Sequence, residues 1–152
     1  MKRVVNGWAD DGQPVVLHEG APPRHFDFGV ATSDEIWVTR AVPAAWQGTG
    51  DPTLGDFQVE PPLGGSICRV ATYRPGASID IHSTKTVDYV IVVSGELTLV
   101  LEDRDITLTQ GDVVVSLAAP HGWANRGETD CVAVAILLTA EGATEDDLIK
   151  WP

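Results

Sequence analysis

Cysteine, positive charge and long apolar runs are all scarce in this sequence of 152 residues. The two cysteines, Cys68 and Cys131, lack C-x-x-C spacing and each lies in a β-branched run, so buried free thiols are expected rather than a disulfide. Only 10 Lys and Arg residues accompany 22 Asp and Glu residues. The net charge of -12 argues against nucleic acid and anionic membranes as partners.

The sequence has no uncharged apolar run of about 18 residues, the length that a membrane-spanning helix needs. Its first seven residues turn polar before the core of a signal peptide could form, so we predict a cytoplasmic protein. The motifs G-x-x-x-x-G-K-[ST], H-E-x-x-H and G-x-S-x-G are absent, and Gly48-x-Gly50 lacks the third glycine of a dinucleotide fingerprint. We therefore expect no nucleotide cofactor.

Strand-forming segments dominate residues 66–139, where β-branched or Leu-rich runs alternate with Gly, Pro and acidic turn residues. No helical stretch of about 10 to 15 residues separates these runs, which argues against a parallel β-α-β architecture. An all-β barrel or sandwich follows. The predicted strands are Ser66–Tyr73, Ser78–Ile81, Val87–Val93, Leu97–Glu102, Arg104–Thr109, Val113–Leu117 and Cys131–Thr139.

The N-terminal part of the chain is predicted to be an irregular arm that packs on the barrel or on a partner. Only Val15–Leu17 and Glu35–Val42 resemble strands there, and residues 43–65 read as a long loop. Trp37 and Trp46 favour an ordered arm, because large aromatic side chains tend to be buried.

The chain length suits one domain with three segments. These are the arm at 1–65, the barrel core at 66–140 and a C-terminal segment at 141–152. Acidic residues follow Thr144, a pattern typical of a helix start, so a short C-terminal helix is expected.

Histidines are the main candidates for chemistry. His82 follows a predicted strand, and in an extended chain Thr84 and Asp88 would share its face. His121 lies on a different strand, but closure into a barrel can bring such positions together. Two imidazoles and a carboxylate form the donor set of a facial metal triad. The other two histidines, His18 and His25, lie in loop-like sequence and are expected to be exposed.

Two motifs around these residues resemble those of the cupin superfamily, whose fold is a double-stranded β-helix, a jelly-roll-like barrel. The first family motif, G-x5-H-x-H-x3,4-E-x6-G, fits without a gap between Gly76 and Gly95. His82 occupies its first histidine position. Thr84 replaces the second histidine, and Asp88 replaces the glutamate.

The second family motif, G-x5-P-x-G-x2-H-x3-N, begins at Gly111. Leu117 and Ala119 replace its Pro and Gly, and His121 arrives one residue early, although the H-x3-N step to Asn125 is kept. The resemblance covers about half of the chain. Within the superfamily, the sequence resembles small single-domain members, the cupin_2-like and RmlC-like barrels of bacteria and fungi.

The resemblance implies a small-molecule site in the barrel lumen. Because the superfamily includes lyases, dehydratases, isomerases, dioxygenases and sugar-binding regulators, the fold selects none of them. Our leading hypothesis is a lyase, dehydratase or isomerase in which His82, Asp88 and His121 are catalytic, with or without a divalent metal (Zn, Fe, Mn or Ni) on the same three residues. The alternatives are a non-haem Fe(II) dioxygenase and a non-catalytic sensor or carrier.

Other residues are predicted to complete the substrate pocket. Thr84 shares the face of His82, and Trp123 lies two residues beyond His121, where its ring could form a wall. Trp37 and Arg40 could reach the mouth, and Arg40 would suit a carboxylate-bearing ligand. Asn125 is expected to secure a turn through its side chain. Since related barrels pair through their edges and the arm must bury its tryptophans, a homodimer is also expected.

Overall fold

The computed structural model describes residues 1–46, 48 and 50–141. Within these ranges the chain forms twelve strands and no helix, which confirms the predicted all-β fold. Consequently, the described part of the chain offers no helix able to cross a membrane. The predicted C-terminal helix at 141–152 lies outside the described residues, except for Glu141.

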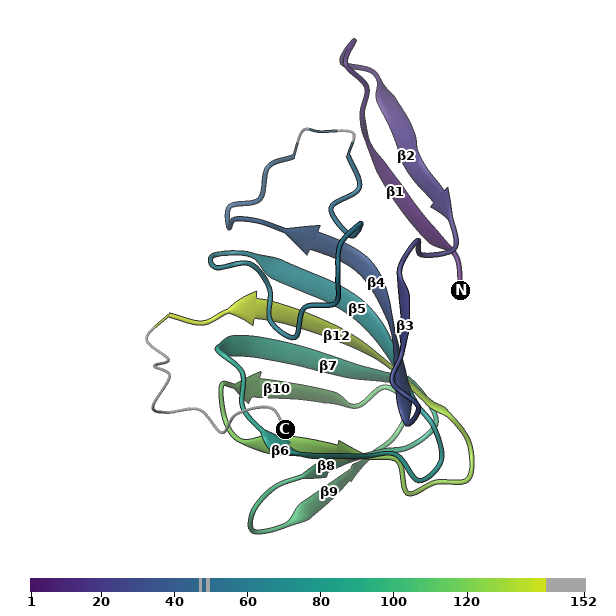
Figure 1. The fold of residues 1–152 in the computed structure, drawn as a ribbon, viewed down its shortest axis with the longest axis vertical. Coiled ribbons are helices and arrows are strands. Elements are labelled where there is room, and N and C mark those ends of the chain that lie inside the picture. The colour runs from purple at the N-terminus through teal and green to yellow at the C-terminus, as the bar shows by residue number, and fades with distance from the viewer. Residues whose placement is uncertain (47, 49, 142–152) are drawn as a thin grey trace.

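Two antiparallel sheets face each other and make up the barrel (Figure 1). The larger sheet has the order β10 (Val113–Leu117), β7 (Thr86–Ser94), β12 (Cys131–Thr139), β5 (Ser66–Tyr73), β4 (Ala31–Thr39) and β3 (His25–Asp27). The smaller sheet has the order β6 (Ser78–His82), β11 (His121–Ala124), β8 (Leu97–Val100) and β9 (Asp105–Leu108). Several neighbouring strands come from distant parts of the chain, as in a jelly roll; β12, for example, pairs with both β5 and β7.

The hydrophobic core lies between the two sheets and follows the two-residue alternation of the strands. Its fully buried members include Leu97 and Val92, and Trp123 packs against them. Both cysteines are free thiols; Cys131 is buried in this core as expected, whereas Cys68 is only half-buried. The same alternation also turns two charged residues, Arg69 of β5 and Asp88 of β7, toward the interior, where both are buried.

The first 65 residues contain more regular structure than their sequence predicts. β3 and β4 join the large sheet, and β4 begins four residues before the predicted Glu35–Val42 strand. β1 (Arg3–Trp8) and β2 (Pro14–Gly20) form a separate hairpin. Gly7 and a bulge make β1 difficult to recognise from the sequence pattern. A Cβ at Gly7 would lie 2.6 Å from Leu17 Cδ1, so a larger residue would require that side chain to move.

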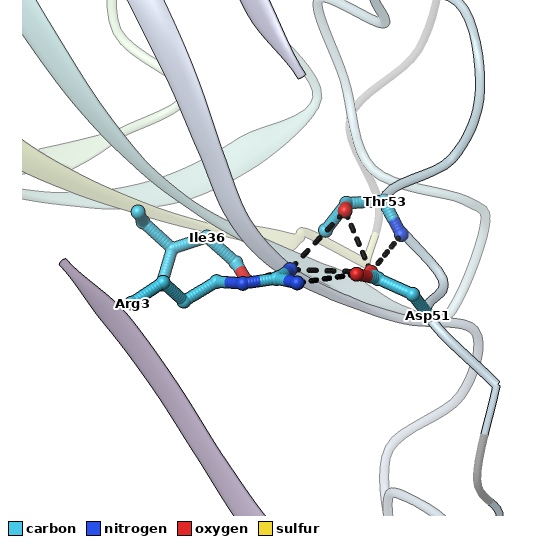
Figure 2. A network of polar contacts seen from close by, with 4 residues as sticks. All are labelled: Arg3, Ile36, Asp51 and Thr53. Carbon is cyan, nitrogen blue, oxygen red and sulfur yellow. Dashed lines mark hydrogen bonds and ion pairs between the residues drawn. The ribbon is translucent and has the colours of Figure 1, made fainter. Parts of the chain in front are cut away.

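A buried ion pair ties this hairpin to the long loop that precedes β5. Arg3 of β1 pairs with Asp51, and their side chains are only 5% and 9% exposed (Figure 2). Arg3 Nη1 also donates to Thr53 Oγ1 and to the carbonyl of Ile36, each at 3.3 Å. The described part of the loop is therefore held against the body of the molecule, as the prediction of an ordered arm requires.

Candidate functional site

A small cavity of about 100 Å³ lies inside the barrel, between the two sheets. Phe57 of the long loop and Trp123 of β11 form aromatic walls, while Ala71 and Ala135 leave space because their side chains are short. The polar residues that line the cavity are Arg69, Tyr73, His82, Thr84, Asp88 and His121. Two charged side chains, Arg69 of β5 and Asp88 of β7, thus share a largely apolar interior with two imidazoles.

His82 and His121 are direct partners in the pairing of β6 and β11, and their ring centroids lie 4.9 Å apart. Each Nδ1 lies against a backbone carbonyl, that of Asp80 at 2.9 Å for His82 and that of Ala119 at 2.8 Å for His121. Because a carbonyl only accepts, each Nδ1 carries the proton and each Nε2 carries the lone pair. Burial lowers the pKa of His82, so this ring is a neutral base at pH 7.

Asp88 is the acidic residue of the cavity and is only 6% exposed. Its Oδ1 has no hydrogen-bond partner among the described residues. Burial raises the pKa of Asp88, an effect opposed by the hydroxyl of Thr86, by His121 and by Arg69. The hydroxyl of Ser116, the cross-strand neighbour of Asp88, lies 3.3 Å from Nδ1 of His121. Asp88 therefore shares the cavity with the histidines as a carboxyl group that keeps its proton to a higher pH than an ordinary aspartate does.

Arg69 and Glu35 form a second buried charged pair that sequence reasoning missed. Arg69 Nε lies 3.4 Å from Glu35 Oε1, and Arg69 Nη2 donates to the carbonyl of Gln58 at 2.7 Å. The guanidinium also lies 4.7 Å from the ring centre of Phe57. A signal was present: Arg69 is the one charged residue in the strand Ser66–Tyr73, on the same face as the buried residues Ile67 and Tyr73.

The other predicted pocket residues divide into two groups. Thr84 and Trp123 line the cavity, and the Trp123 ring meets His121 edge-on at 5.4 Å. Trp37 and Arg40 do not line it, which corrects that prediction. Trp37 packs against the ring of His18 at 6.3 Å on the hairpin side, and Arg40 lines a separate cleft of about 390 Å³.

Three further predictions can be compared with the structure. His18 is half-buried rather than exposed, because Trp37 packs on it. His25 is exposed as expected. Asn125 is fully buried and bonds three backbone groups, donating to the carbonyls of Tyr73 and Thr129 and accepting from the N–H of Gly127, which confirms its role in a turn.

The residues present do not fit the predicted metal triad. The Nε2 atoms of His82 and His121 are chemically suitable donors, since each ring is oriented by a carbonyl on its other nitrogen. However, no group of three or more His, Cys, Asp or Glu side chains in the described ranges is arranged to hold a metal ion. Asp88 does not complete such a set, and Thr84 offers only a weakly donating hydroxyl.

Comparison with known proteins agrees with this fold. The family model described as "Cupin domain" matches residues 69–137. The chain is 30% identical over 129 residues to "Cupin-domain-containing oxidoreductase virC" of Hypocrea virens, covering 81% of this chain and 66% of that protein. It is 38% identical over 82 residues to "Phomopsin biosynthesis cluster protein C'" of Diaporthe leptostromiformis, covering 51% and 43%.

Among solved structures, an uncharacterized conserved protein with a double-stranded β-helix domain from Klebsiella pneumoniae superposes with a TM-score of 0.54. Its identity is 18%, and the match covers 77% of this chain and 84% of that one. Through residues 69–137, the chain belongs to the cupin family. It spans only 66% and 43% of the length of the two curated relatives.

Proposed function

We propose that this chain is a small-molecule cupin enzyme that catalyses a lyase, dehydratase or isomerase reaction by acid–base chemistry in its lumenal cavity. One observation carries the proposal: a buried carboxyl group with an unpartnered oxygen shares a cavity with two imidazoles whose Nε2 atoms carry lone pairs. Burial raises the pKa of Asp88 and lowers that of His82. Groups whose pKa values are moved in these directions suit an acid and a base at neutral pH.

The proposed step is a proton transfer that needs no oxidant. Nε2 of His82 or His121 removes a proton from a carbon next to a carbonyl or carboxyl group. The neutral Asp88 carboxyl gives its proton to a leaving hydroxyl, which departs as water, or to a neighbouring carbon, which completes an isomerisation. The apolar walls strengthen both interactions, because charges attract more strongly where water is excluded.

The test follows proton exchange rather than one chosen reaction. Small hydroxy and oxo compounds are incubated with the protein in D₂O, and deuterium uptake at carbon is measured by NMR. We expect uptake or turnover in the wild type and its loss in His82→Ala and Asp88→Asn, with cooperative unfolding retained. His25→Ala is the matched control, since this histidine is exposed and outside the cavity. Unchanged turnover in His82→Ala would refute the proposal.

A second candidate is oxidoreductase activity, favoured by the name that virC carries and by the two suitably oriented imidazoles. The protein would then be a non-haem Fe(II) dioxygenase. His82 and His121 would hold the iron, and groups other than their described neighbours would complete its coordination. Elemental analysis of protein purified without chelator, followed by oxygen-consumption measurements with iron, separates the two candidates. Binding without any turnover would instead indicate a sensor or carrier.

A homodimer, with a cytoplasmic location, completes the proposal. β10 is an edge strand of the large sheet, and the outer face of β10 and β7 carries an exposed apolar surface. Edge strands of this kind are candidate pairing sites. Gel filtration should give about twice the 16.2 kDa chain mass, and a monomer mass would contradict it. The exposed members of this surface are Tyr89, Val93, Val113, Val115 and Leu117.

A further inference from the structure

Arg69 is a buried cation on the cavity wall that the acid–base step does not use. It is 8% exposed, and its ion pair with Glu35 and its hydrogen bond to Gln58 hold the guanidinium in place. A guanidinium has five N–H donors in a planar fork. One hydrogen bond and one ion pair leave donors available for an oxygen-rich ligand.

The sheet register places this cation diagonally across from the acid. β12 lies between β5 and β7; on it Ala135 pairs with Arg69, and Leu137, two residues further on, pairs with Asp88. The two residues are therefore two strand spacings apart and offset by two positions along the strands, roughly 12 Å between backbones. The short side chain of Ala135 leaves space between them, and both residues line the same cavity.

We propose that Arg69 binds the carboxylate of the substrate, and that the substrate class is a small carboxylic acid with a hydroxyl or carbonyl group close to the carboxylate. This inference rests on the proposed function. The guanidinium recognises the carboxylate, while the unpartnered Asp88 oxygen and the two imidazoles face the second oxygen function. A cavity of about 100 Å³ limits the ligand to a few non-hydrogen atoms.

The charges in the cavity agree with such a ligand. A neutral Asp88 carboxyl does not repel a bound carboxylate and can donate a hydrogen bond to its hydroxyl or carbonyl oxygen. During removal of the neighbouring proton, negative charge develops on the carboxylate, where Arg69 would stabilise it. The outer cleft offers a poorer anion site, because Arg40 shares it with Glu35, Asp56 and Glu60.

The experiment compares three probes of similar size: lactate, its neutral analogue lactamide, and propanoate, which lacks the hydroxyl. Binding is followed by NMR through the imidazole signals of His82 and His121, with His18 and His25 as internal references outside the cavity. We expect lactate to shift the two cavity signals in a saturable way. Lactamide should bind about tenfold more weakly or worse, because it lacks the charge. Propanoate should bind between the two.

Variants then locate the carboxylate. Arg69→Gln should weaken lactate binding about tenfold or more, whereas Arg40→Gln should leave it unchanged. Since Arg69→Gln leaves Glu35 buried without its partner, the double variant Arg69→Gln/Glu35→Gln tests the same loss with both charges removed. Circular dichroism melting checks that each variant folds cooperatively.

Three results would overturn the inference: lactamide binding as tightly as lactate, loss of binding in Arg40→Gln but not in Arg69→Gln, or no response of the wild-type cavity signals to lactate. The failure of the proposed function would look different. Arg69-dependent lactate binding without any proton exchange would keep this substrate class and remove the acid–base enzyme. Proton exchange in a neutral compound, unaffected by Arg69→Gln, would keep the acid–base enzyme and remove this substrate class.

Discussion

Replacement of Asp88 by Asn should make the folded protein more stable at neutral pH while removing its activity. The carboxyl group is buried, its Oδ1 has no hydrogen-bond partner among the described residues, and burial raises its pKa. A group that was kept for stability would have its polar atoms paired. Asn has nearly the same shape as Asp but carries no charge, so the substitution isolates the cost of the buried carboxylate.

The sign follows from proton linkage. The folded protein holds the Asp88 proton up to a higher pH than the unfolded chain, whose ordinary aspartate pKa is about 3.9. The free energy of unfolding therefore falls as the pH rises from about 4 through the folded pKa, by about 1.4 kcal/mol for each unit of difference. Above the folded pKa the whole penalty is present. Because Asn keeps a polar side chain in the same place, the gain expected for Asp88→Asn at pH 7 is this ionisation cost alone.

Urea unfolding at pH 7 and near pH 4 measures this difference. The gain should be present at pH 7 and much smaller at the lower pH, where Asp88 is protonated in the folded protein and about half protonated in the unfolded chain. Because removal of any negative charge relieves repulsion in a chain of net charge -12, the exposed Asp10→Asn variant serves as the matched control. A loss of stability in Asp88→Asn at pH 7 would refute the reasoning and make the carboxylate a structural partner of Arg69.

Three further outcomes are expected. Because burial lowers the pKa of His82, the unfolded chain binds a proton at this imidazole at a higher pH than the folded protein does. The free energy of unfolding should therefore fall as the pH drops below about 6.5, and urea titrations of His82→Gln should show a weaker dependence on pH. Arg3→Met should lower the free energy of unfolding by about 3–5 kcal/mol, because it leaves Asp51 buried and unpaired. The double variant Arg3→Met/Asp51→Leu should recover most of this stability in thermal unfolding, and equal losses in the single and double variants would contradict the explanation. Asn125→Ala should cost about 3 kcal/mol for three backbone hydrogen bonds, and a change below about 1 kcal/mol in calorimetry would count against that role.

The barrel strands could be predicted from the sequence because alternation and turn residues coincide there. β10 and β12 have the predicted bounds, and β5 does as well. His121 was expected on a strand, but the bounds of β11 were not predicted, because His121–Ala124 is only four residues long and contains Gly122, which looks like a loop signal. That glycine is instead a close contact, since a Cβ there would lie 2.6 Å from the carbonyl oxygen of Ile79.

The site could be predicted only where a motif marked it. His82 and His121 stood out as motif positions, and the barrel brings them together as cross-strand partners. Arg69 lies outside both motifs, and its burial depends on Glu35, which is 34 positions earlier in the chain. Nothing local in the sequence links these two residues. Arg40 was the more conspicuous cation, but β4 ends at Thr39 and Arg40 faces the outer cleft.

Satisfaction of hydrogen bonds separates the structural polar residues of this barrel from the functional candidates. Asn125 is fully buried, yet both ends of its amide bond to backbone groups, so its burial stabilises the fold. Arg3 and Asp51 likewise satisfy each other. Asp88 is buried to a similar degree with one oxygen unpaired, inside the one cavity that also holds both imidazoles among the pockets described. A ligand that donates to that oxygen would remove the deficit, so binding at this site should itself stabilise the protein.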